Sequence, residues 1–281
     1  MAGRVEGKVV FITGGARGQG RNHALRLAAE GADVVLFDIC HDLKTVAYDL
    51  ASPADLADTV AAVEGLGRKA IGVQGDVRDF SALQAAVDRT VETFGKLDVV
   101  LANAGISGKA PGHEMAGWAA TAGTNLVGVM NTFHAALPSM TSGGSAIATG
   151  SFAALKPGGI GREPSSQAYT YAKRALIEYV QRLAAAAGGL GIRVNGVHPT
   201  NCNTRILHNE PQYRAFRPDL ENPTREDVLP AFASLQLFPG VPYIECDDVT
   251  NTILYLASEE SRYVTGQFIA IDAGAHLKLL D

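Results

Sequence analysis

The sequence predicts an α/β fold: a doubly wound parallel sheet of about seven strands with helices on both faces, in a single domain of 281 residues. Three observations lead to this prediction. Short apolar runs rich in β-branched residues alternate with longer runs rich in alanine and leucine. The short runs are almost continuously apolar, as expected of strands buried on both faces. No internal repeat or change of composition marks a boundary between domains.

The predicted strands are short and end near glycine, aspartate or proline. They cover residues 8–13, 33–38, 69–76, 96–105, 144–150, 192–199 and 266–274. The predicted helices lie between them, where the runs are longer. They cover residues 20–31, 54–67, 80–95, 113–137, 166–187 and 247–258. A helix between successive strands is the usual crossover of a parallel pair.

Two stretches interrupt this alternation. Residues 39–53 lengthen the connection after the second strand beyond the usual few residues. Residues 200–245 lack a clear strand and contain six prolines. Long insertions on the rim of a sheet are often functional, so both are candidate parts of a site within the single domain 1–281.

Composition excludes several classes of protein. The formal net charge is −5, which disfavours a nucleic-acid or anionic-membrane partner. The three cysteines, Cys40, Cys202 and Cys246, are far apart in sequence without CxxC spacing, which indicates reduced thiols. No apolar run has the length of a signal peptide or membrane span, and the histidines form no ligand-spaced cluster. We therefore expect a soluble cytoplasmic protein without a catalytic metal.

A glycine-rich turn, TGGARGQG at 13–20, joins the first strand to the first helix. Gly14 and Gly18 can adopt backbone angles closed to other residues, and Gly20 lets the helix approach the strand closely. The helix N-terminus then offers free N–H groups to a pyrophosphate. No Gly-Lys-Ser/Thr follows, so the turn is not a P-loop. This pattern predicts a dinucleotide site.

Asp38 ends the second strand, where a carboxylate can accept hydrogen bonds from both ribose hydroxyls. It would repel a 2′-phosphate, which favours NAD over NADP. Arg17 offers a cation near the same position and keeps NADP open. We favour NAD, because a carboxylate facing a phosphate is costly whereas an arginine can turn to solvent.

Tyr169 and Lys173 are four residues apart in the segment SSQAYTYAKRALIEYV and share one face of a predicted helix. An ammonium beside a phenol favours the phenolate, so we expect a lowered Tyr169 pKa and a role in proton transfer. Tyr171 points elsewhere and is expected to pack.

Four motifs occur in order: Gly14-xxx-Gly18-x-Gly20, NAG at 103–105, Tyr169-xxx-Lys173 and VTGQFIAIDAG near the end. Together they resemble the short-chain dehydrogenase/reductase family in its compact single-domain branch, which implies a Rossmann-type fold. The segments 7–40 and 198–227 resemble more narrowly the actinobacterial carveol-dehydrogenase-like subfamily, which is linked to mycofactocin.

The resemblance implies a catalytic set and a cofactor site. The catalytic residues are Asn125, Ser151, Tyr169 and Lys173. The cofactor-binding residues are Gly14, Arg17, Gly18, Gln19, Gly20, Asp38, Ile39, Asp76, Val77, Asn103, Ala104, Gly105, Tyr169, Lys173, Pro199, Thr200, Asn201 and Thr204. Asp76 and Val77 would flank adenine, and Pro199, Thr200 and Thr204 would lie along the nicotinamide.

Two of the catalytic assignments have rivals in the sequence. Ser151 would orient the substrate oxygen, although it stands 18 residues before Tyr169 and the segment 156–166 looks like an insertion. Its rivals by type are Ser145, Ser165 and Ser166. Asn125 would distort its helix and hold a water that leads toward the lysine; its rival by type is Asn131.

These expectations combine into an NAD-dependent oxidoreductase that interconverts a hydrophobic secondary alcohol and its ketone. The alternatives are an NADPH-dependent 3-oxoacyl reductase and an inactive dinucleotide-sensing or scaffold protein. Residues 200–245 are expected to form a substrate lid, from the aromatic and apolar residues Tyr213, Phe216, Phe232, Leu235, Leu237, Phe238 and Tyr243.

The resemblance also implies partners. Residues 39–53 are expected to fold over the adenosine and retain NAD, with electrons passing to a separate acceptor. A homotetramer would form through the helices at 113–137 and 166–187 and the C-terminal strand region.

Overall fold

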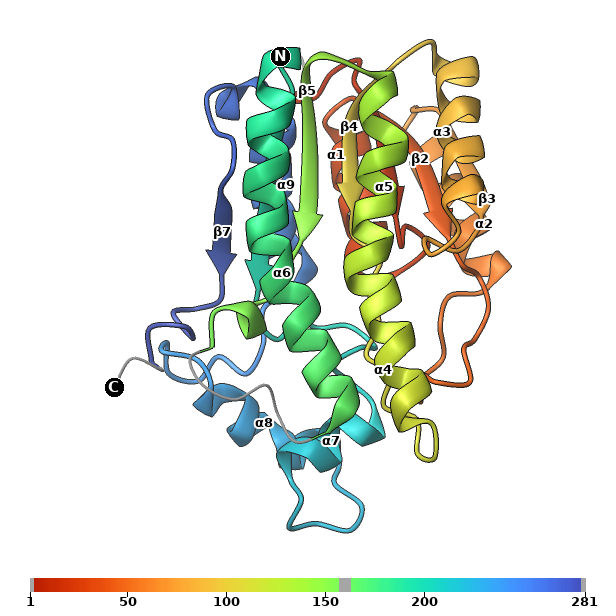
Figure 1. Cartoon of the computed structure of the whole chain (residues 1–281). Coiled ribbons are helices and arrows are strands. Elements are labelled where there is room, and N and C mark those ends of the chain that lie inside the picture. The colour runs from red at the N-terminus through yellow and green to blue at the C-terminus, as the bar shows by residue number, and fades with distance from the viewer. Residues whose placement is uncertain (1–2, 157–162, 279–281) are drawn as a thin grey trace.

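The computed structural model describes residues 3–156 and 163–278, and these form a seven-stranded sheet (Figure 1). The strands are β1 (Val9–Thr13), β2 (Asp33–Asp38), β3 (Ala70–Gln74), β4 (Leu97–Ala102), β5 (Met140–Thr149), β6 (Arg193–Pro199) and β7 (Phe268–Ile271). All neighbours are parallel, in the order β3-β2-β1-β4-β5-β6-β7. The order reverses between β1 and β4, where such sheets open a ligand crevice at the carboxyl ends of their strands. The predicted sheet is confirmed.

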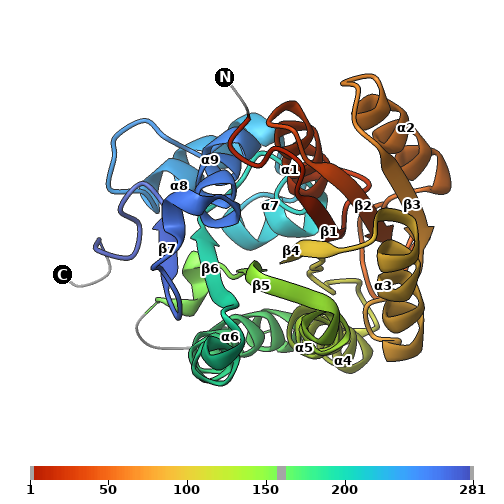
Figure 2. The same cartoon turned by 90° about the horizontal axis from the view of Figure 1, so that it is seen from above.

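Helices cover both faces of the sheet (Figure 2). One face carries α1 (Gly18–Ala29), α2 (Pro53–Glu64) and α9 (Cys246–Ala257). The other carries α3 (Phe80–Phe94), α4 (Glu114–Ala122), α5 (Gly128–Ala136) and α6 (Pro164–Ala187). Short 3-10 turns occur at Leu137–Ser139, Phe152–Ala154, Gly188–Leu190 and Glu259–Ser261.

The side chains of β1 show why its sequence is apolar throughout. Val10 and Ile12 belong to the core on the α1 face, while Phe11 belongs to the core on the α3 face. All three are fully buried. A strand covered on both faces buries every side chain, and each large one contributes about 1.5–3 kcal/mol on burial. The apolar run thus gives β1 a central place in the sheet.

Helix boundaries follow local capping signals. The Ser52 hydroxyl accepts from the Asp55 N–H, and the Asp55 carboxylate accepts from the Ser52 N–H, which starts α2 with a reciprocal cap. Pro53 occupies the first turn, where its missing N–H costs nothing. Each such cap contributes about 1 kcal/mol. The α2 cap therefore ends the 39–53 insertion at a defined point.

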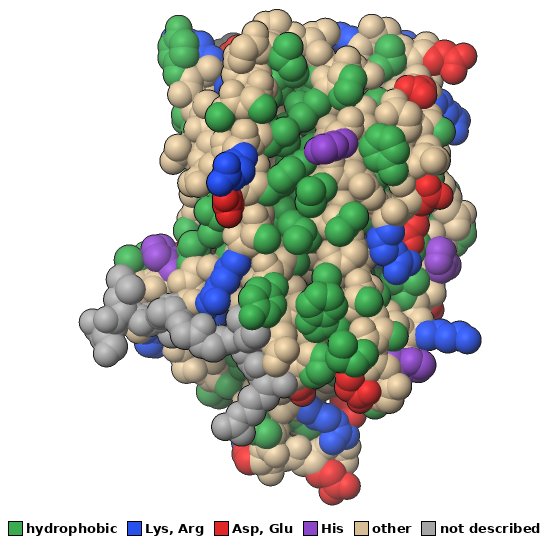
Figure 3. All heavy atoms as spheres, in the orientation of Figure 1, with side chains coloured by type: hydrophobic (Ala, Val, Ile, Leu, Met, Phe, Trp, Pro, Cys, Tyr) green, Lys and Arg blue, Asp and Glu red, His purple; other side chains and the backbone are tan. Residues whose placement is uncertain are grey.

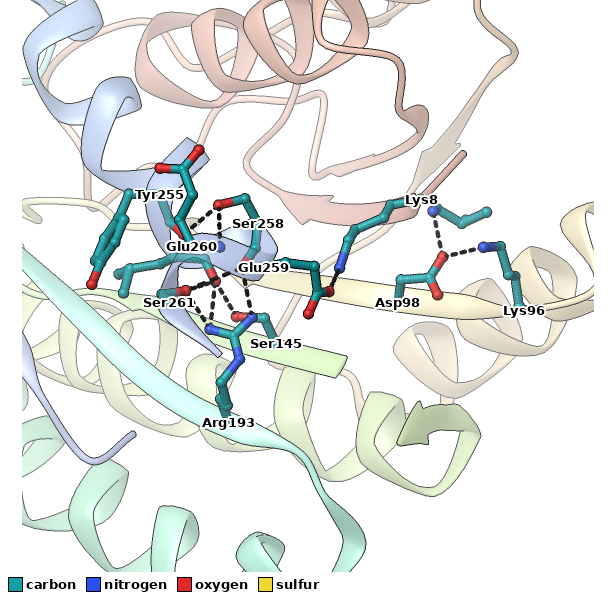
Figure 4. A network of polar contacts seen from close by, with 12 residues as sticks. Lys8, Lys96, Asp98, Ser145, Arg193, Tyr255, Ser258, Glu259, Glu260 and Ser261 are labelled. Carbon is teal, nitrogen blue, oxygen red and sulfur yellow. Dashed lines mark hydrogen bonds and ion pairs between the residues drawn. The ribbon is translucent and has the colours of Figure 1, made fainter. Parts of the chain in front are cut away.

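A polar network closes the sheet at the amino ends of its strands (Figure 4). Arg193 starts β6 and donates to the Leu256 carbonyl at 2.8 Å and to the Ser261 hydroxyl at 2.6 Å. Lys8 pairs with Glu259 at 2.8 Å. These contacts join the starts of β1 and β6 to the end of α9. They lie at the opposite edge of the sheet from the carboxyl ends of the strands.

The structure departs from the prediction in two places. The single helix expected at 113–137 is α4 and α5 joined by a π-helix at Gly123–Val127. The segment 200–245, for which no helix was predicted, contains α7 (Glu210–Phe216) and α8 (Arg225–Ser234). The sequence contains their N-terminal capping residues, Asn209 for α7 and the Thr224–Asp227 pair for α8. Pro230, however, lies inside α8, and a proline within a segment argues against a helix there.

None of the helices in the described ranges is long and apolar enough to cross a membrane. Two short helices, α7 and α8, lie beyond the carboxyl ends of the strands (Figure 1).

Candidate active site

A cavity of about 610 Å³ lies at the carboxyl ends of the central strands. Of the catalytic and cofactor residues predicted from the sequence, every one except Asn125 lines it. The cavity therefore brings together motifs that are up to 190 residues apart, from Gly14 to Thr204.

The glycine turn has the backbone geometry that the sequence predicted. Gly14 and Gly18 have φ of 66° and 54°, in the left-handed region that favours glycine. A Cβ atom on Gly20 would stand 1.9 Å from the Gly14 carbonyl oxygen, so no larger residue fits there. The Thr13 hydroxyl accepts from the N–H groups of Asn103 and Ala104 at 3.1 and 3.2 Å, which fixes the turn against the loop after β4.

Three buried polar atoms on the cavity wall have no hydrogen-bond partner within the described chain. They are Arg17 Nη1, Gln19 Oε1 and Asn201 Nδ2. Buried polar groups are normally paired, so these atoms indicate a ligand with both donors and acceptors. A dinucleotide satisfies that requirement beside the glycine turn, and the residues present fit it.

Arg17 does not turn to solvent, contrary to the expectation from the sequence. Its side chain is partly buried, and burial together with the nearby Arg205 lowers its pKa. Asp38 and Asp55 act in the opposite direction on that pKa. The arginine thus faces the cavity alongside Asp38 and does not leave it.

Asp38 is held firmly at the end of β2. Its carboxylate is 7% exposed and accepts from the Ala16 N–H at 3.0 Å and the Cys40 N–H at 3.4 Å. Burial raises its pKa, while these hydrogen bonds and Arg17 lower it. A fixed carboxylate on the cavity wall is suited to ribose hydroxyls and unsuited to a phosphate.

Tyr169 and Lys173 both lie on α6 and both line the cavity. The Lys173 ammonium is 3% exposed, donates to the Thr149 carbonyl at 2.6 Å and stands 5.7 Å from the Tyr169 ring centroid. Tyr171 points away from this face and is 54% exposed, so its expected packing role within the chain is wrong.

The expected pKa of Tyr169 is wrong for this structure. Burial raises the pKa of the phenol, and a hydrogen bond with Ser151 only partly offsets the rise. The Lys173 ammonium donates to the Thr149 carbonyl. Burial instead lowers the pKa of Lys173 to about 8. Desolvation is the largest influence on both pKa values, because the Tyr169 phenol and the Lys173 ammonium are both enclosed by the protein.

Ser151 is placed by its backbone and by one residue that the sequence reasoning missed. Its N–H donates to His198 Nδ1 at 3.0 Å, which requires the neutral imidazole with its proton on Nε2. The His198 ring stacks on Phe268 with centroids 4.2 Å apart, and Gly150 leaves room for it. Burial lowers the His198 pKa to about 4. Nothing in the spacing of the sequence pointed to this contact.

The rival serines differ from Ser151 in their surroundings. Ser145 donates to the Leu256 carbonyl at 2.7 Å in the network at the far edge of the sheet. Ser165 donates to the Gly108 carbonyl. Ser166 lines the cavity but shares no resolved hydrogen bond with Tyr169, whereas Ser151 does.

Asn125 lies in the π-helix between α4 and α5 and is fully buried. Its Oδ1 accepts from the Ile106 N–H and its Nδ2 donates to the Ile106 carbonyl, both at 2.9 Å. The expected helix distortion is confirmed, and it anchors the loop after β4. Its rival Asn131 lies in α5 and donates to the Val77 carbonyl at 3.0 Å. A water held by Asn125 stays a prediction.

The 39–53 insertion crosses the cavity to the loop after β4. The Tyr48 hydroxyl accepts from the Ser107 N–H at 3.2 Å, and the Ala110 N–H donates to the Thr45 carbonyl at 3.2 Å. Leu43, Tyr48 and Leu50 line the cavity. The insertion therefore reaches the loop after β4, and its place over the adenosine stays a prediction.

Only some of the apolar side chains expected to form a lid from residues 200–245 face the cavity. Of the seven predicted lid side chains, Phe216 and Leu235 line it. Phe232 is fully buried in a small separate core, with Tyr213, Phe216 and Tyr243 against it. Leu237 and Phe238 are 49% and 60% exposed.

The three cysteines form no disulfide in this structure, and their reduced state stays a prediction. Cys202 and Cys246, distant in sequence, nevertheless bring their sulfurs within 3.8 Å. Within the described residues, no cluster of His, Cys, Asp or Glu side chains could hold a metal ion.

A family model described as enoyl-(acyl carrier protein) reductase matches residues 14–276, almost the whole chain. The chain belongs to the short-chain dehydrogenase/reductase family. Within this family, it is 46% identical to a putative short-chain type dehydrogenase/reductase of Mycolicibacterium smegmatis, over 99% of this chain and 100% of that protein. It is 45% identical to the (−)-trans-carveol dehydrogenase of Rhodococcus erythropolis, over 98% of this chain and 99% of that protein.

A solved structure in the same family has a very similar fold. The carveol dehydrogenase of Mycobacterium avium, crystallised in complex with NAD, superposes with a TM-score of 0.91 at 43% identity. The match covers 98% of this chain and 99% of that one. The Rossmann-type fold and the narrower carveol-dehydrogenase-like resemblance are thus confirmed.

Proposed function

We propose that the protein is an NAD-dependent dehydrogenase that interconverts an apolar secondary alcohol and its ketone. The observation that carries this proposal is the Ser151–Tyr169–Lys173 group in one cavity with the glycine turn. The fixed Asp38 carboxylate supports NAD, the cofactor in the solved Mycobacterium avium relative. The name of the Rhodococcus relative, a carveol dehydrogenase, supports a cyclic apolar alcohol.

The chain's own residues handle the oxygen and the proton. Ser151 orients the substrate hydroxyl, and Tyr169 takes its proton in oxidation or returns it in reduction. Lys173 holds the Tyr169 environment rigid through its contact with Thr149 and can pass on the proton, since its pKa is about 8. Bound NAD would supply the hydride acceptor, next to Pro199 and Thr200.

A panel of cyclic and acyclic apolar secondary alcohols, assayed with NAD, NADP and an artificial electron acceptor, tests the proposal. We expect oxidation of at least one cyclic alcohol class with NAD preferred over NADP. A clear preference for NADPH with 3-oxoacyl substrates would favour the 3-oxoacyl reductase instead. Loss of all turnover with intact dinucleotide binding would favour the sensing or scaffold role.

The 39–53 insertion supports a further proposal, that NAD exchanges slowly and electrons leave to a separate acceptor such as mycofactocin. The segment spans the cavity and is tied down by the Tyr48–Ser107 hydrogen bond, with Leu43 and Leu50 beside it. A dinucleotide beneath it could leave only after these contacts open.

Tyr48→Phe is expected to accelerate release of bound NAD by about 3–10-fold, because it removes one hydrogen bond worth about 0.5–1.5 kcal/mol while keeping the packing. Exchange of bound NAD for labelled NAD measures the rate. Tyr263→Phe, at a residue that is 90% exposed, is the matched control. Equal release from wild type and Tyr48→Phe would show that the 39–53 insertion does not limit exchange.

We also propose self-association through the face made by α4, α5 and α6. Hydrophobic side chains gather over α5 and α6 on this face (Figure 3). Val127 and Tyr171 contribute to this surface, with 46% and 54% exposure, and a contiguous exposed apolar patch supports an interaction site. A homotetramer built on this face fits the family resemblance, and sedimentation of the purified protein would measure its size.

A further inference from the structure

Charge is distributed unevenly along the cavity. Its lining carboxylates among the described residues are Asp38, Asp55 and Asp76, from the ends of β2 and β3 and the start of α2. Arg17 and Arg205 lie close enough to Asp38 and Asp55 to interact electrostatically with them. Asp76 pairs with Arg78 at 2.5 Å, so each carboxylate in the glycine-turn half of the cavity has a cation nearby.

The catalytic half has cations without this balance. Lys109 lies in the loop after β4 and lines the cavity. Its Nζ donates to the Gln212 side-chain oxygen at 3.0 Å, and it forms no ion pair with any described residue. Burial lowers its pKa, against a weaker opposing effect of Glu163.

Lys156 shows the same pattern from another element. It lies five residues after Ser151, beyond the short turn at Phe152–Ala154, and also lines the cavity. Its Nζ stands 4.7 Å from the Phe152 ring centroid, and burial lowers its pKa with no carboxylate acting against it. Within the described chain it likewise forms no ion pair.

The cofactor does not account for these two ammonium groups. A pyrophosphate would lie at the start of α1, where Gly18 and Gln19 offer N–H groups. Lys173 is already engaged with the Thr149 carbonyl. Partly desolvated ammonium groups that form no ion pair gain most from an anion, because the attraction strengthens as water is excluded.

We propose that the substrate is an apolar secondary alcohol that also carries a carboxylate, and that Lys109 and Lys156 bind this carboxylate. Ser151 and Tyr169 then hold the hydroxyl, while Phe216 and Leu235 cover the apolar body between the two polar ends. This substrate class rests on the proposed alcohol dehydrogenase function and narrows it.

Matched substrate pairs test the substrate class. Each pair consists of a cyclohexanol with a carboxylate on the ring or on a short arm, and its uncharged carboxamide. We expect kcat/KM for the best carboxylate to exceed that of its amide by tenfold or more, and the ratio to fall with added salt. Comparable turnover of both members would overturn this proposal and leave the alcohol dehydrogenase function standing.

Single variants assign the site. Lys109→Met and Lys156→Met are each expected to lower kcat/KM for the carboxylate at least fivefold and to leave the amide within twofold. Lys69→Met, at an exposed lysine outside the cavity lining, controls for overall charge. Equal losses for carboxylate and amide would mean that the lysines only support the structure, which contradicts the proposal.

A binding measurement makes the test independent of turnover. Calorimetry on the NAD-loaded protein compares cyclohexanecarboxylate with cyclohexanecarboxamide, neither of which can be oxidised at a hydroxyl. We expect tighter binding of the carboxylate, lost in Lys109→Met. Such binding without oxidation of any alcohol would refute the proposed dehydrogenase function alone, whereas oxidation without such binding would refute the anion site alone.

Discussion

Tyr169→Phe is expected to lower kcat for alcohol oxidation by about 10²–10⁴-fold, the range that a positioned acid or base contributes. The variant keeps the aromatic ring on α6 and removes only the hydroxyl that bonds Ser151. NAD affinity should fall far less than kcat, since the glycine turn and Asp38 are untouched. Steady-state kinetics and dinucleotide titration on the same preparation separate the two effects.

Tyr171→Phe is the matched control, because it removes a phenolic hydroxyl from the same helix on its exposed face. It should retain full activity. Activity in Tyr169→Phe close to that of wild type would mean that another group moves the proton, and the mechanism would then be wrong.

The pH dependence should follow from the raised Tyr169 pKa. Oxidation needs the phenolate, whose fraction grows about tenfold per pH unit below the pKa. Because burial raises that pKa above its usual value, kcat/KM for oxidation should climb through neutral pH into the alkaline range. Ketone reduction, which needs the phenol, should lack this rise. A flat oxidation profile between pH 6 and 9 would contradict the assignment.

The sheet and the glycine turn were predictable because their causes are local. The run VVFIT is apolar throughout, which by itself predicts a strand buried on both faces. Gly14, Gly18 and Gly20 predict the turn directly, because the turn needs residues without a side chain at these positions. Lys173 and Tyr169 share a face because helix geometry alone decides that.

Other parts of the site depend on contacts between distant segments. His198 reaches Ser151 only because β6 lies beside β5, and Tyr48 meets Ser107 only because the 39–53 insertion crosses the cavity. The Tyr169 pKa depends on burial by the whole fold, so one helical turn of sequence gave the wrong sign. Lys109 and Lys156 belong to no motif, and only the structure shows that both line the cavity and that neither forms an ion pair with a described residue.

Two buried histidines should make the protein sensitive to acid. His23 on α1 is fully buried with Nδ1 2.7 Å from the Thr250 hydroxyl, and burial lowers its pKa to about 3. His198 is 1% exposed, with a pKa lowered to about 4. Both remain neutral in the folded protein at pH values where an unfolded chain has already taken up protons on them.

The sign follows from proton counting. An unfolded histidine protonates near pH 6.5, so below that pH the unfolded state binds more protons and the free energy of unfolding falls as pH falls. The loss continues to the folded pKa, near 4 for His198 and near 3 for His23. By pH 4 it reaches on the order of 3 kcal/mol for each residue, a large part of a typical total of about 5–15 kcal/mol.

Urea unfolding between pH 7 and 4.5 measures this loss above the range in which ordinary carboxylates titrate most. Wild type should lose stability steadily below pH 6.5. His23→Gln should be less stable at pH 7, because Gln fills the site imperfectly, but should show a shallower fall with acid, as should His198→Gln. His134→Gln, at an exposed histidine, should keep the wild-type slope. The linkage is a property of buried imidazoles only if the slope changes at positions 23 and 198 and not at 134; identical slopes in all four proteins would place the acid sensitivity elsewhere in the molecule.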